Sequence, residues 1–514
     1  MSMVRVVLLV PLLGCVADTL GQTGGQLITG ATDAVTEAAT DTPGGTSDAP
    51  TTGVPATCGD GAVQDPEECD DGNQVETDIC TNACTTARCG DGIVGPGEMC
   101  DAAGFSSGCN DDCTESQCGD ARLNPEAGEA CDDGDMKGGA CSPTCALNKI
   151  TDISLGVYHT CIVIEGGILR CWGSNNKGAL GAGHLNTIGD EPGEMPATDV
   201  NIGGAADRAA AGDTFMCVLL GNGSVRCWGY AQEGRLGYGD LQDLGADPNQ
   251  MPTPEVDVGI LVRGIATGDS HTCVWTTDDR VRCWGWSASL GIMADENVGD
   301  QPGEMPPIDI PGLAGVTAIA AGGYSSCALA GDGGLWCWDY AASQPNVGGE
   351  VKQVAIGSGH QCVLLKSGDV RCWGNGDQGQ LGYENPDHIQ ELELPTANLN
   401  LGGKASQIVA GRAHSCALME TGKVKCWGSG MSGALGSGEK LNIGDSPEEM
   451  PPPDVALGGE VILLAAHASL HTCAVLADFS LRCWGENNSG QLGYGHNEPI
   501  GDDELPESAG PVPF

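Results

Sequence analysis

The sequence is poor in aromatic residues and in positive charge. Phe, Trp and Tyr make up 4% of its 514 residues, and 22 Lys and Arg stand against 70 Asp and Glu, so the net charge is −48. A chain this acidic is repelled by a phosphate backbone and has no basic patch to release counterions, which excludes nucleic acid as a partner. Because large rings are scarce, aliphatic residues and cross-links must hold the core together.

The N-terminal apolar run is too short to cross a bilayer. It covers residues 6–13, after Arg5, whereas a transmembrane helix needs about 20 apolar residues. The run ends in Leu-Leu-Gly-Cys15, which is similar to the lipobox of bacterial lipoproteins. That resemblance implies cleavage before Cys15 and attachment of diacylglycerol to its thiol. We therefore predict that residues 1–15 are a lipoprotein signal peptide. The protein is expected to be exported and anchored by lipid at the bacterial outer membrane or cell surface.

Residues 16–57 contain no Lys or Arg and are rich in Thr, Gly, Ala and Asp. Such a segment cannot bury enough apolar surface to offset the loss of chain entropy on folding. We expect it to be a disordered tether between the anchor and the folded part of the chain.

Cysteine, by contrast, is abundant, and 14 of the 27 cysteines fall into seven regular pairs. The two members of each pair are ten residues apart, and Trp follows the second. A fixed unit that recurs every 35 to 57 residues or so indicates a repeat architecture. The pairs are Cys161/Cys171, Cys217/Cys227, Cys273/Cys283, Cys327/Cys337, Cys362/Cys372, Cys416/Cys426 and Cys473/Cys483.

Each pair is predicted to lie in a β-hairpin. Two apolar, β-branched runs flank a polar centre, such as Gly-Asn-Gly at 221–223. Side chains alternate along a strand, and folding about Gly166 sets Cys161 opposite Cys171, close to disulfide range. We therefore predict a disulfide within each hairpin. Fourteen buried free thiols are the alternative, and metal ligation is disfavoured because the units contain no C-x-x-C.

Longer motifs surround the hairpins. Gly-x-x-His-Thr-Cys precedes them at 156–161 and 268–273, and Trp-Gly-x-x-x-x-Gly-x-Leu-Gly follows at 172–181, 228–237, 373–382, 427–436 and 484–493. This pattern resembles the regulator of chromosome condensation repeat family, whose members form seven-bladed β-propellers. The resemblance implies an all-β fold with a seven-bladed β-propeller over residues 150–514. Two copies depart from the pattern, because the gap between Trp284 and Leu290 is short and Asp339 follows Trp338.

Residues 58–149 carry three other cysteine-rich repeats, which open with Cys-Gly-Asp and continue with Glu-x-Cys-Asp. They resemble repeats in surface proteins of myxobacteria and related bacteria. Units of about 30 residues cannot build a core alone, so we predict a small disulfide-rich module. Four cysteines allow three pairings in each unit, and all three stay open. A zinc site at the C-x-x-x-C pairs is the alternative. The cysteines are Cys58, Cys69, Cys80 and Cys84, then Cys89, Cys100, Cys109 and Cys113, then Cys118, Cys131, Cys141 and Cys145.

The cysteine count agrees with export. The seven hairpin pairs and the twelve cysteines of the repeats leave Cys15 as the single remaining cysteine. An even set plus one lipobox cysteine is what an exported, disulfide-bonded lipoprotein predicts.

Aspartates beside the cysteines of the repeats are candidate calcium ligands, since calcium takes several oxygen atoms. Asp133-Gly-Asp135, however, lacks the spaced ligands and terminal Glu of an EF-hand, so solvated turn aspartates are the alternative. We expect no other cofactor. The candidates are Asp70, Asp71, Asp132, Asp133 and Asp135.

Two further features recur in the propeller repeats. Histidines 159, 271, 360, 414 and 471 each stand two residues before the first cysteine. A ring of imidazoles could bind metal, but we favour hydrogen bonds that tie each blade to its neighbour. Three acidic segments that end in Met-Pro, at 189–196, 299–306 and 444–451, are interpreted as structural turns, with a contact surface as the alternative.

The sequence indicates no active site, so we predict that the protein is not an enzyme. The first hypothesis is a lipid-anchored surface propeller that binds a protein or glycan, because fold alone does not determine function. The second is an extracellular hydrolase or lyase, which would need carboxylates or histidines clustered at one end of the propeller axis. The third is guanine-nucleotide exchange, as in eukaryotic members of the resembled family, but an exported chain would meet no cytosolic GTPase.

Overall fold

The computed structural model describes residues 58–514, except 76, 97, 103, 133–140, 142–144, 340 and 391–396. The chain divides into two units, Met1–Thr57 and Cys58–Phe514. The predicted lipidation site Cys15 and the predicted tether lie outside the described residues. Among the residues that are described, no helix has both the length and the apolar character that a membrane crossing requires.

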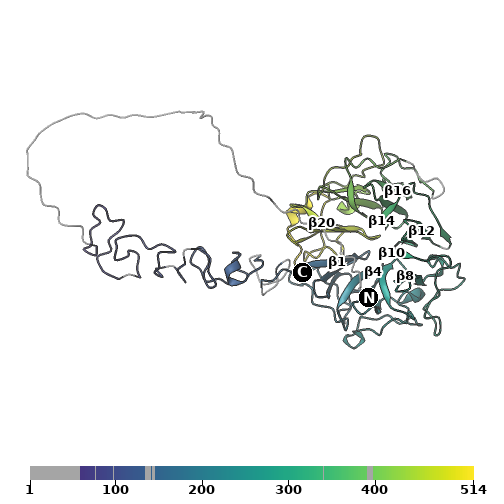
Figure 1. The fold of residues 1–514 in the computed structure, drawn as a ribbon, viewed down its shortest axis with the longest axis horizontal. Coiled ribbons are helices and arrows are strands. Elements are labelled where there is room, and N and C mark those ends of the chain that lie inside the picture. Colours follow the sequence, from purple (N-terminus) through teal and green to yellow (C-terminus); the bar gives the residue numbers. More distant parts are fainter. Residues whose placement is uncertain are drawn as a thin grey trace, which may run out of the picture. The chain divides into compact units, whose positions relative to one another are not determined.

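The propeller consists of seven antiparallel sheets, which confirms the predicted all-β class and the seven blades. Blades 1 to 7 follow in chain order, and Figure 1 shows β1, β4, β10, β14 and β20 around a common centre. Blade 1 contains β1 (Ile150–Leu155), β2 (His159–Ile164) and β3 (Ile168–Gly173); blade 2 contains β4 (Ala206–Ala211), β5 (Phe215–Leu220) and β6 (Val225–Gly229); blade 3 contains β7 (Val262–Thr267), β8 (His271–Thr276) and β9 (Val281–Gly285). Blade 4 contains β10 (Val316–Gly322), β11 (Ser325–Ala330), β12 (Leu335–Trp338) and β13 (Ala342–Ser343); blade 5 contains β14 (Val351–Ile356), β15 (His360–Leu365) and β16 (Val370–Gly374). Blade 6 contains β17 (Ala405–Ala410), β18 (His414–Met419) and β19 (Val424–Gly428); blade 7 contains β20 (Val461–Ala465), β21 (His471–Leu476) and β22 (Leu481–Gly485).

Short 3₁₀ turns connect some of these strands. They are η2 (Gln232–Gly234), η3 (Pro248–Gln250), η4 (Ser287–Ser289) and η6 (Met431–Gly433). Two further 3₁₀ turns lie outside the blades, η1 (Pro125–Ala127) in the cysteine-rich region and η7 (Pro506–Ala509) after the last strand.

The paired cysteines face each other across the second and third strands of every blade. In each hairpin the two cysteines are register partners, and they form a disulfide with a Cα–Cα distance of 4.1 Å. A cross-strand pair at this separation belongs to a single hairpin, so each disulfide stabilises its own blade. In the order of the blades, the disulfides are Cys161–Cys171, Cys217–Cys227, Cys273–Cys283, Cys327–Cys337, Cys362–Cys372, Cys416–Cys426 and Cys473–Cys483.

The core lies between the blades, where the disulfide of one blade packs against the Trp of the next. Trp228 shares a cluster with Cys161 and Cys171, and Trp284 shares one with the disulfide of blade 2. Trp172 of blade 1 packs in the same way with Cys473 and Cys483 of blade 7. Large buried rings supply much of the apolar area that a core needs. One Trp and one disulfide at each contact between blades therefore compensate for the low aromatic content.

The buried indole groups also form a repeated hydrogen bond between blades. The Nε1–H of the Trp donates to a backbone carbonyl in the Gly-x-Leu-Gly tail of the preceding blade, at 2.9–3.1 Å. The donor and acceptor pairs are Trp228 and Ala179, Trp284 and Arg235, Trp427 and Gln380, Trp484 and Ala434, and Trp172 and Gln491.

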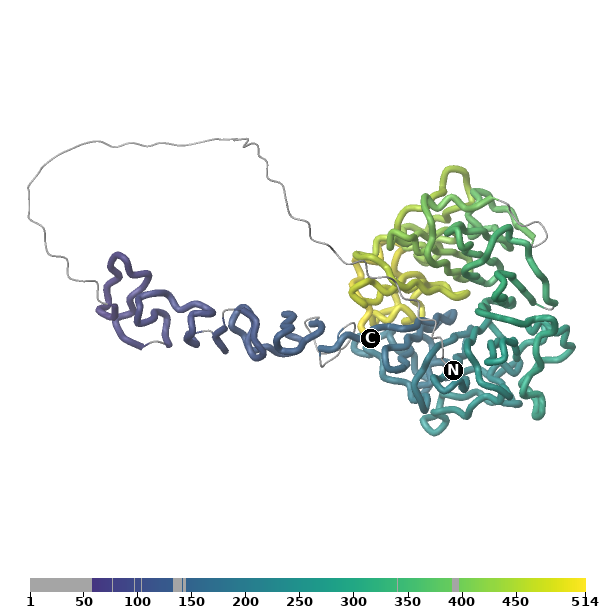
Figure 2. The backbone as a smooth tube through the Cα atoms, in the orientation of Figure 1, coloured from purple at the N-terminus to yellow at the C-terminus, as the bar shows by residue number. Residues whose placement is uncertain are grey.

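The last of these pairs closes the ring. Figure 2 shows the chain running round the ring in sequence order until the yellow C-terminal part returns beside blade 1. At this seam between blades 7 and 1, Gly495 N–H also donates to the Gly189 carbonyl at 3.0 Å. Equivalent bonds join the loops of other neighbouring blades, for example Gly239 N–H to the Gly299 carbonyl at 2.9 Å. The ring is therefore closed by the same contacts that join consecutive blades.

Blade 4 is the irregular member, as its divergent sequence indicated. The tail of blade 3 is short, and Gly291 lies against the ring of Trp338, as the equivalent glycines of the regular blades lie against theirs. The buried Nε1 of Trp338 has no hydrogen-bond partner within the described part of the chain. An unsatisfied buried donor destabilises its surroundings, so this contact lacks one bond that the regular blades have.

The cysteine-rich region has the same pairing in all three units. The first cysteine bonds the fourth and the second bonds the third, which selects one of the three pairings left open by the sequence. The disulfides are Cys58–Cys84, Cys69–Cys80, Cys89–Cys113, Cys100–Cys109, Cys118–Cys145 and Cys131–Cys141.

Candidate functional site

The cysteines of the propeller belong to the scaffold. All fourteen are buried and bonded within their own hairpins, so they offer no free thiol as a nucleophile or metal ligand. The second cysteine of each pair lies on the third strand, directly before the buried Trp that packs on the preceding blade. These residues are Cys171, Cys227, Cys283, Cys337, Cys372, Cys426 and Cys483.

The five repeated histidines lie between blades. Four of them bond a hydroxyl group of the next blade through Nε2, at 2.7–2.8 Å. The pairs are His271 and Ser326, His360 and Ser415, His414 and Thr472, and His471 and Thr160. This arrangement supports the structural interpretation of the histidines.

The hydroxyl groups determine which imidazole nitrogen carries the proton. Thr160 Oγ1–H donates to the Gln491 carbonyl at 2.8 Å, so the Thr160 oxygen must accept from the Nε2–H of His471. Ser415 and the Gln380 carbonyl impose the same tautomer on His360. Burial lowers the pKa of His360 and His471 to about 3. A second proton would have to occupy a buried Nδ1 that has no partner here.

His159 is the exception to the predicted bonding. The next blade has Met216 at the position where its neighbours have Ser or Thr, so the buried Nε2 of His159 is without a partner within the described residues. Burial lowers its pKa to about 4. The prediction that every histidine would tie two blades together is wrong at this position.

The three acidic segments that end in Met-Pro form structural turns, as we favoured. In the first loop, Glu194 Oε2 accepts the N–H groups of Gly189, Asp190 and Glu191 at 2.9–3.1 Å. Glu304 and Glu449 occupy equivalent positions in their own loops. The glutamates therefore organise loops that pack against the preceding blade.

The candidate calcium ligands have backbone partners where the structure describes them. Asp70 Oδ2 accepts from Gly59 and Asp60, and Oδ1 accepts from Gly61 and Gly72. Burial tends to raise the pKa of Asp70, but these N–H groups bring it below its ordinary value.

Asp132 accepts the N–H groups of residues 119–121 in the same way, and Asp71 is exposed and accepts from Asn73. Asp133 and Asp135 lie outside the described residues. Carboxylates that hold a Cys-Gly-Asp turn have a structural task without an ion, and calcium binding stays a prediction.

One end of the propeller axis carries side chains that vary from blade to blade. We call this surface the turn face. It consists of the turns between the first and second strands, at 156–158, 212–214, 268–270, 323–324, 357–359, 411–413 and 466–470, and the residue after each Trp-Gly pair. In six blades the latter residue donates its N–H to the last turn carbonyl, for example Tyr230 to Thr214 at 3.1 Å. The hydrogen bond places two variable side chains beside each other.

Aromatic residues occupy the turn face of blades 1 to 4. Tyr158 is 37% exposed and Tyr324 is 51% exposed, while Tyr230 and Trp286 are half-buried. Trp286 of blade 3 contacts Tyr324 of blade 4 edge to face, with ring centroids 4.9 Å apart. Lys177 Nζ of blade 1 lies 4.6 Å from the ring centroid of Tyr230. In blades 5 to 7 the same positions hold Gly359, Ala413, Leu470, Asn375, Ser429 and Glu486.

Charged groups surround the axis on this face. Asp213 and Asp269 occupy adjacent turns of blades 2 and 3 and are half-buried. Burial raises the pKa of both; Asp213 raises that of Asp269 further, and the nearby Arg235 and Arg412 oppose the shifts. Arg235 is buried and donates to the backbone carbonyls of Gln232 and Asp269 at 2.8 and 3.1 Å, as well as to the Glu233 carboxylate.

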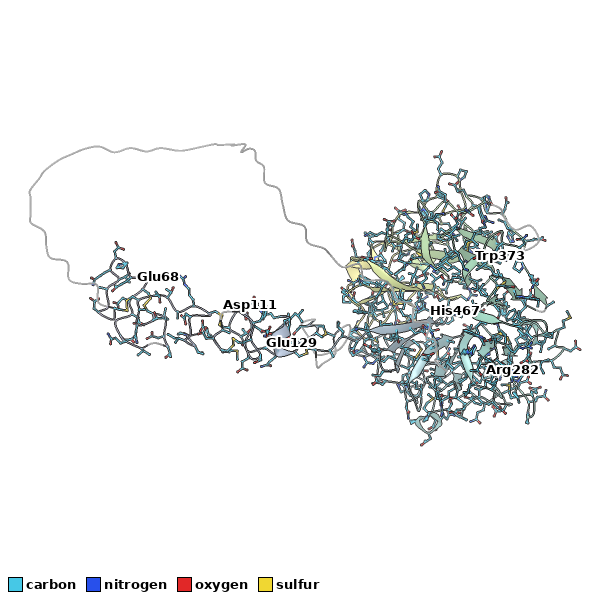
Figure 3. All side chains as sticks on the ribbon, in the orientation of Figure 1. Glu68, Asp111, Glu129, Arg282, Trp373 and His467 are labelled. Atoms are coloured by element: carbon cyan, nitrogen blue, oxygen red, sulfur yellow. A yellow bond between two sulfur atoms is a disulfide. The ribbon has the colours of Figure 1, made fainter. Side chains whose placement is uncertain are left out.

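His467 reaches across the centre of the ring. Its Nε2–H donates to the Ala321 carbonyl of blade 4 at 2.5 Å, although His467 itself belongs to blade 7. Figure 3 shows its label near the middle of the ring. The axial groups therefore include two carboxylates, two guanidinium groups and an imidazole. Such a set can bind charged or polar groups.

Sequence reasoning missed this face. Its residues fall at the two unspecified positions of Gly-x-x-His and just after Trp-Gly, where the repeats do not resemble each other. Variation at fixed positions of a repeat was the available signal, because in repeat proteins the variable loops often gather on a binding face.

Several segments of the chain match known protein families. Residues 150–179, 208–235, 262–289, 351–380 and 405–433 match the Regulator of chromosome condensation (RCC1) repeat, and residues 367–418 match a second family of the same description. Residues 56–85 match the Domain of unknown function (DUF4215).

Two known proteins have sequences similar to a large part of this chain. The Ultraviolet-B receptor UVR8 of Arabidopsis thaliana is 28% identical over 376 residues, which cover 69% of this chain and 81% of that protein. Protein pim1 of Schizosaccharomyces pombe is 26% identical over 348 residues, which cover 58% of this chain and 62% of that protein.

Two solved structures have a similar fold. Human WBSCR16 aligns with a TM-score of 0.51 at 19% identity, over 62% of this chain and 84% of that one. Yeast RCC1 (Prp20), solved in complex with Kap60, aligns with a TM-score of 0.51 at 21% identity, over 62% and 78% of the two chains.

Proposed function

Because the chain carries repeats of the regulator of chromosome condensation family on a seven-bladed propeller, we propose that it is an exported, lipid-anchored binding protein without catalytic activity. It recognises a protein or glycan through the turn face of blades 1 to 4. The many disulfides belong to an oxidising compartment, which supports export.

The grouping of aromatic residues on four adjacent blades carries this proposal. The chain has only 4% aromatic residues, yet exposed or half-buried rings stand on the turn face of each of blades 1 to 4. Tyr, Trp and Arg are enriched at the energetic centres of binding surfaces, since they combine a large apolar area with hydrogen-bonding groups. The same face of blades 5 to 7 lacks rings at these positions, so the contact surface covers one side of the axis.

The hydrolase alternative meets one of its requirements, because carboxylates and a histidine do gather near the axis. His467, however, donates its Nε2–H to the Ala321 carbonyl, and this bond gives its ring a structural task between blades 7 and 4. The Arg235 guanidinium is held by two carbonyls and Glu233. Both groups thus hold the scaffold in place, and this task requires no catalysis.

Anchoring depends on Cys15 in this proposal. We expect Cys15→Ser to abolish partitioning into the detergent phase and to leave the propeller folded, because the thiol is the site of lipid attachment. Detergent-phase separation of the wild type and the variant, with circular dichroism of both, measures this. Equal partitioning of the two proteins would refute the lipid anchor.

Binding is tested with the Cys15→Ser chain as a soluble bait. We expect Tyr158→Ser, Trp286→Ser and Tyr324→Ser, combined, to remove the envelope proteins or glycans that the parent bait captures. The matched control carries Asn375→Ala, Ser429→Ala and Glu486→Ala, on the same face of blades 5 to 7, and should capture them unchanged. Equal capture by both triple variants would contradict the assignment of the face.

A further inference from the structure

We propose that the turn face of blades 1 to 4 binds a cationic protein segment, whose Lys or Arg side chains pair with Asp213 and Asp269 beside the aromatic rings. This inference rests on the proposed function and names the chemistry of the partner. Three observations carry it: the continuity of the rings, the state of the two carboxylates and the charge of the whole chain.

The aromatic surface and the carboxylates form one connected patch. The ring of Tyr230 lies 5.0 Å from the Arg235 guanidinium, and Arg235 donates to the Asp269 carbonyl. Asp269 N–H donates to the Gly323 carbonyl at 2.8 Å, and Gly323 precedes Tyr324. A segment that lies on Tyr324 and Trp286 is therefore close to both acidic turns.

One ring of this face, that of Tyr230, already contacts cations of the chain itself. Lys177 and Arg235 both lie within 5.0 Å of the Tyr230 centroid. A cation within about 6 Å of an aromatic ring is attracted by the negative face of the ring. Tyr230 is thus occupied, whereas Tyr158 and Tyr324 are exposed to solvent and are available to a cation from outside.

The two carboxylates are poorly compensated. Arg235 directs its nitrogens to the Gln232 and Asp269 carbonyls and to Glu233, so its charge is largely balanced by Glu233. Arg412 of blade 6 and His467 of blade 7 also face Asp269. Even with these neighbours, burial raises the pKa of Asp213 and Asp269, which means that their charged forms are under-solvated. A cation from a partner would stabilise them.

Charge complementarity favours a cationic partner over a neutral or acidic one. The chain has a net charge of −48, and a charge of this size speeds the approach of cationic molecules and repels anionic ones. Long-range attraction is not specific, however. The half-buried carboxylates and the rings beside them supply the local contacts that select a particular site.

The experiment is calorimetric titration of the full chain carrying Cys15→Ser with three probes. These are a peptide of alternating Arg and Gly, its Glu-Gly counterpart and a neutral chitooligosaccharide. We expect the Arg-Gly peptide alone to bind. Asp213→Asn with Asp269→Asn should weaken its binding about tenfold or more, since a partly desolvated charge pair is worth at least about 1.4 kcal/mol.

The matched control removes two charges elsewhere. Asp257 and Asp332 are exposed and each accepts a backbone N–H, from Gly259 and Gly334 respectively. Asp257→Asn with Asp332→Asn retains an oxygen that accepts each N–H and removes the same number of charges as Asp213→Asn with Asp269→Asn. It should alter the affinity for the Arg-Gly peptide less than about twofold.

Three outcomes would overturn the inference. Equal weakening by the two double variants would mean non-specific attraction to an acidic protein. Binding of the oligosaccharide but not of the peptide would leave the proposed binding function in place with a glycan partner. Binding of neither probe would reject the cationic partner, while the bait experiment above would still test the binding function separately.

Discussion

Acidification from pH 7 to pH 5 is expected to lower the free energy of unfolding of the propeller by roughly 5–10 kcal/mol. Burial lowers the pKa of His159 and His414 to about 4, and that of His271, His360 and His471 to about 3. In the unfolded chain these groups titrate near 6.5. The unfolded chain therefore takes up protons below pH 6.5 that the folded chain does not. The contribution of the five histidines to the free energy of unfolding is full above pH 6.5. It is lost as the pH falls towards 4 and then 3.

Two effects oppose this loss. Burial raises the pKa of Asp152 to about 6 and that of Glu504 to about 7, and it also raises the pKa of Asp213 and Asp269. The folded state therefore gains stability from these carboxyl groups as the pH falls. Protonation of surface carboxylates also relieves repulsion within a chain of net charge −48. Each histidine contributes about 2 kcal/mol between pH 6.5 and 5, and the five together outweigh these carboxyl groups.

A matched pair of variants isolates the histidines. At pH 7, His471→Phe should lower the free energy of unfolding by about 1–2 kcal/mol, because it removes the bond to Thr160 at the seam. His159→Phe should cause no loss, since Nε2 of His159 has no partner in the described residues and Phe215 fills the equivalent position in blade 2. Both variants should lose about one fifth of the acid sensitivity contributed by the five histidines. Urea unfolding at pH 7 and pH 5 measures this. An unchanged dependence on pH in both would show that other groups titrate.

Replacing Gly490 with alanine should lower the free energy of unfolding by roughly 3–5 kcal/mol. Gly490 has φ of +66°, and a Cβ atom there would lie 2.4 Å from Asp190 N and from Gly189 C. Both contacts are with backbone of blade 1, across the seam that closes the ring. The blades would have to separate, which would weaken the Trp172 and Thr160 bonds to the Gln491 carbonyl.

Gly193→Ala is the control for backbone strain alone. Gly193 has φ of +92°, and a Cβ atom there would meet nothing within 4 Å. This variant should lose about 1 kcal/mol. Denaturant unfolding of both variants, with hydrogen exchange of the Trp172 indole as a local probe, makes the comparison. A Gly490→Ala loss no larger than that of Gly193→Ala would show that the seam does not need this close approach.

Features that arise within one hairpin could be predicted from the sequence. Cys161 and Cys171 are ten residues apart around a polar turn, and the alternation of strand side chains alone sets them opposite each other. The cysteines of 58–145 show the limit of this reasoning. Their spacing allows three pairings per unit, and only the fold of each unit, with Asp70 holding the Cys-Gly-Asp turn, selects the bonds of first to fourth and second to third cysteine.

Features that join blades depended on residues distant in the sequence. The position of His471 indicated a bond to a neighbour, but its acceptor Thr160 lies 311 residues away. The same spacing at His159 leads to Met216, which offers no hydroxyl.

The sequence by itself determined the hairpins, their disulfides, the number of repeats and the acidic character of the chain, because each follows from local periodicity or composition. Only the tertiary structure decided which variable residues meet. Tyr324, Asp213, Arg412 and His467 come together because a closed ring brings the same turn of every blade to one end of its axis. No local pattern records that convergence, since the positions involved are the ones that the repeat leaves free.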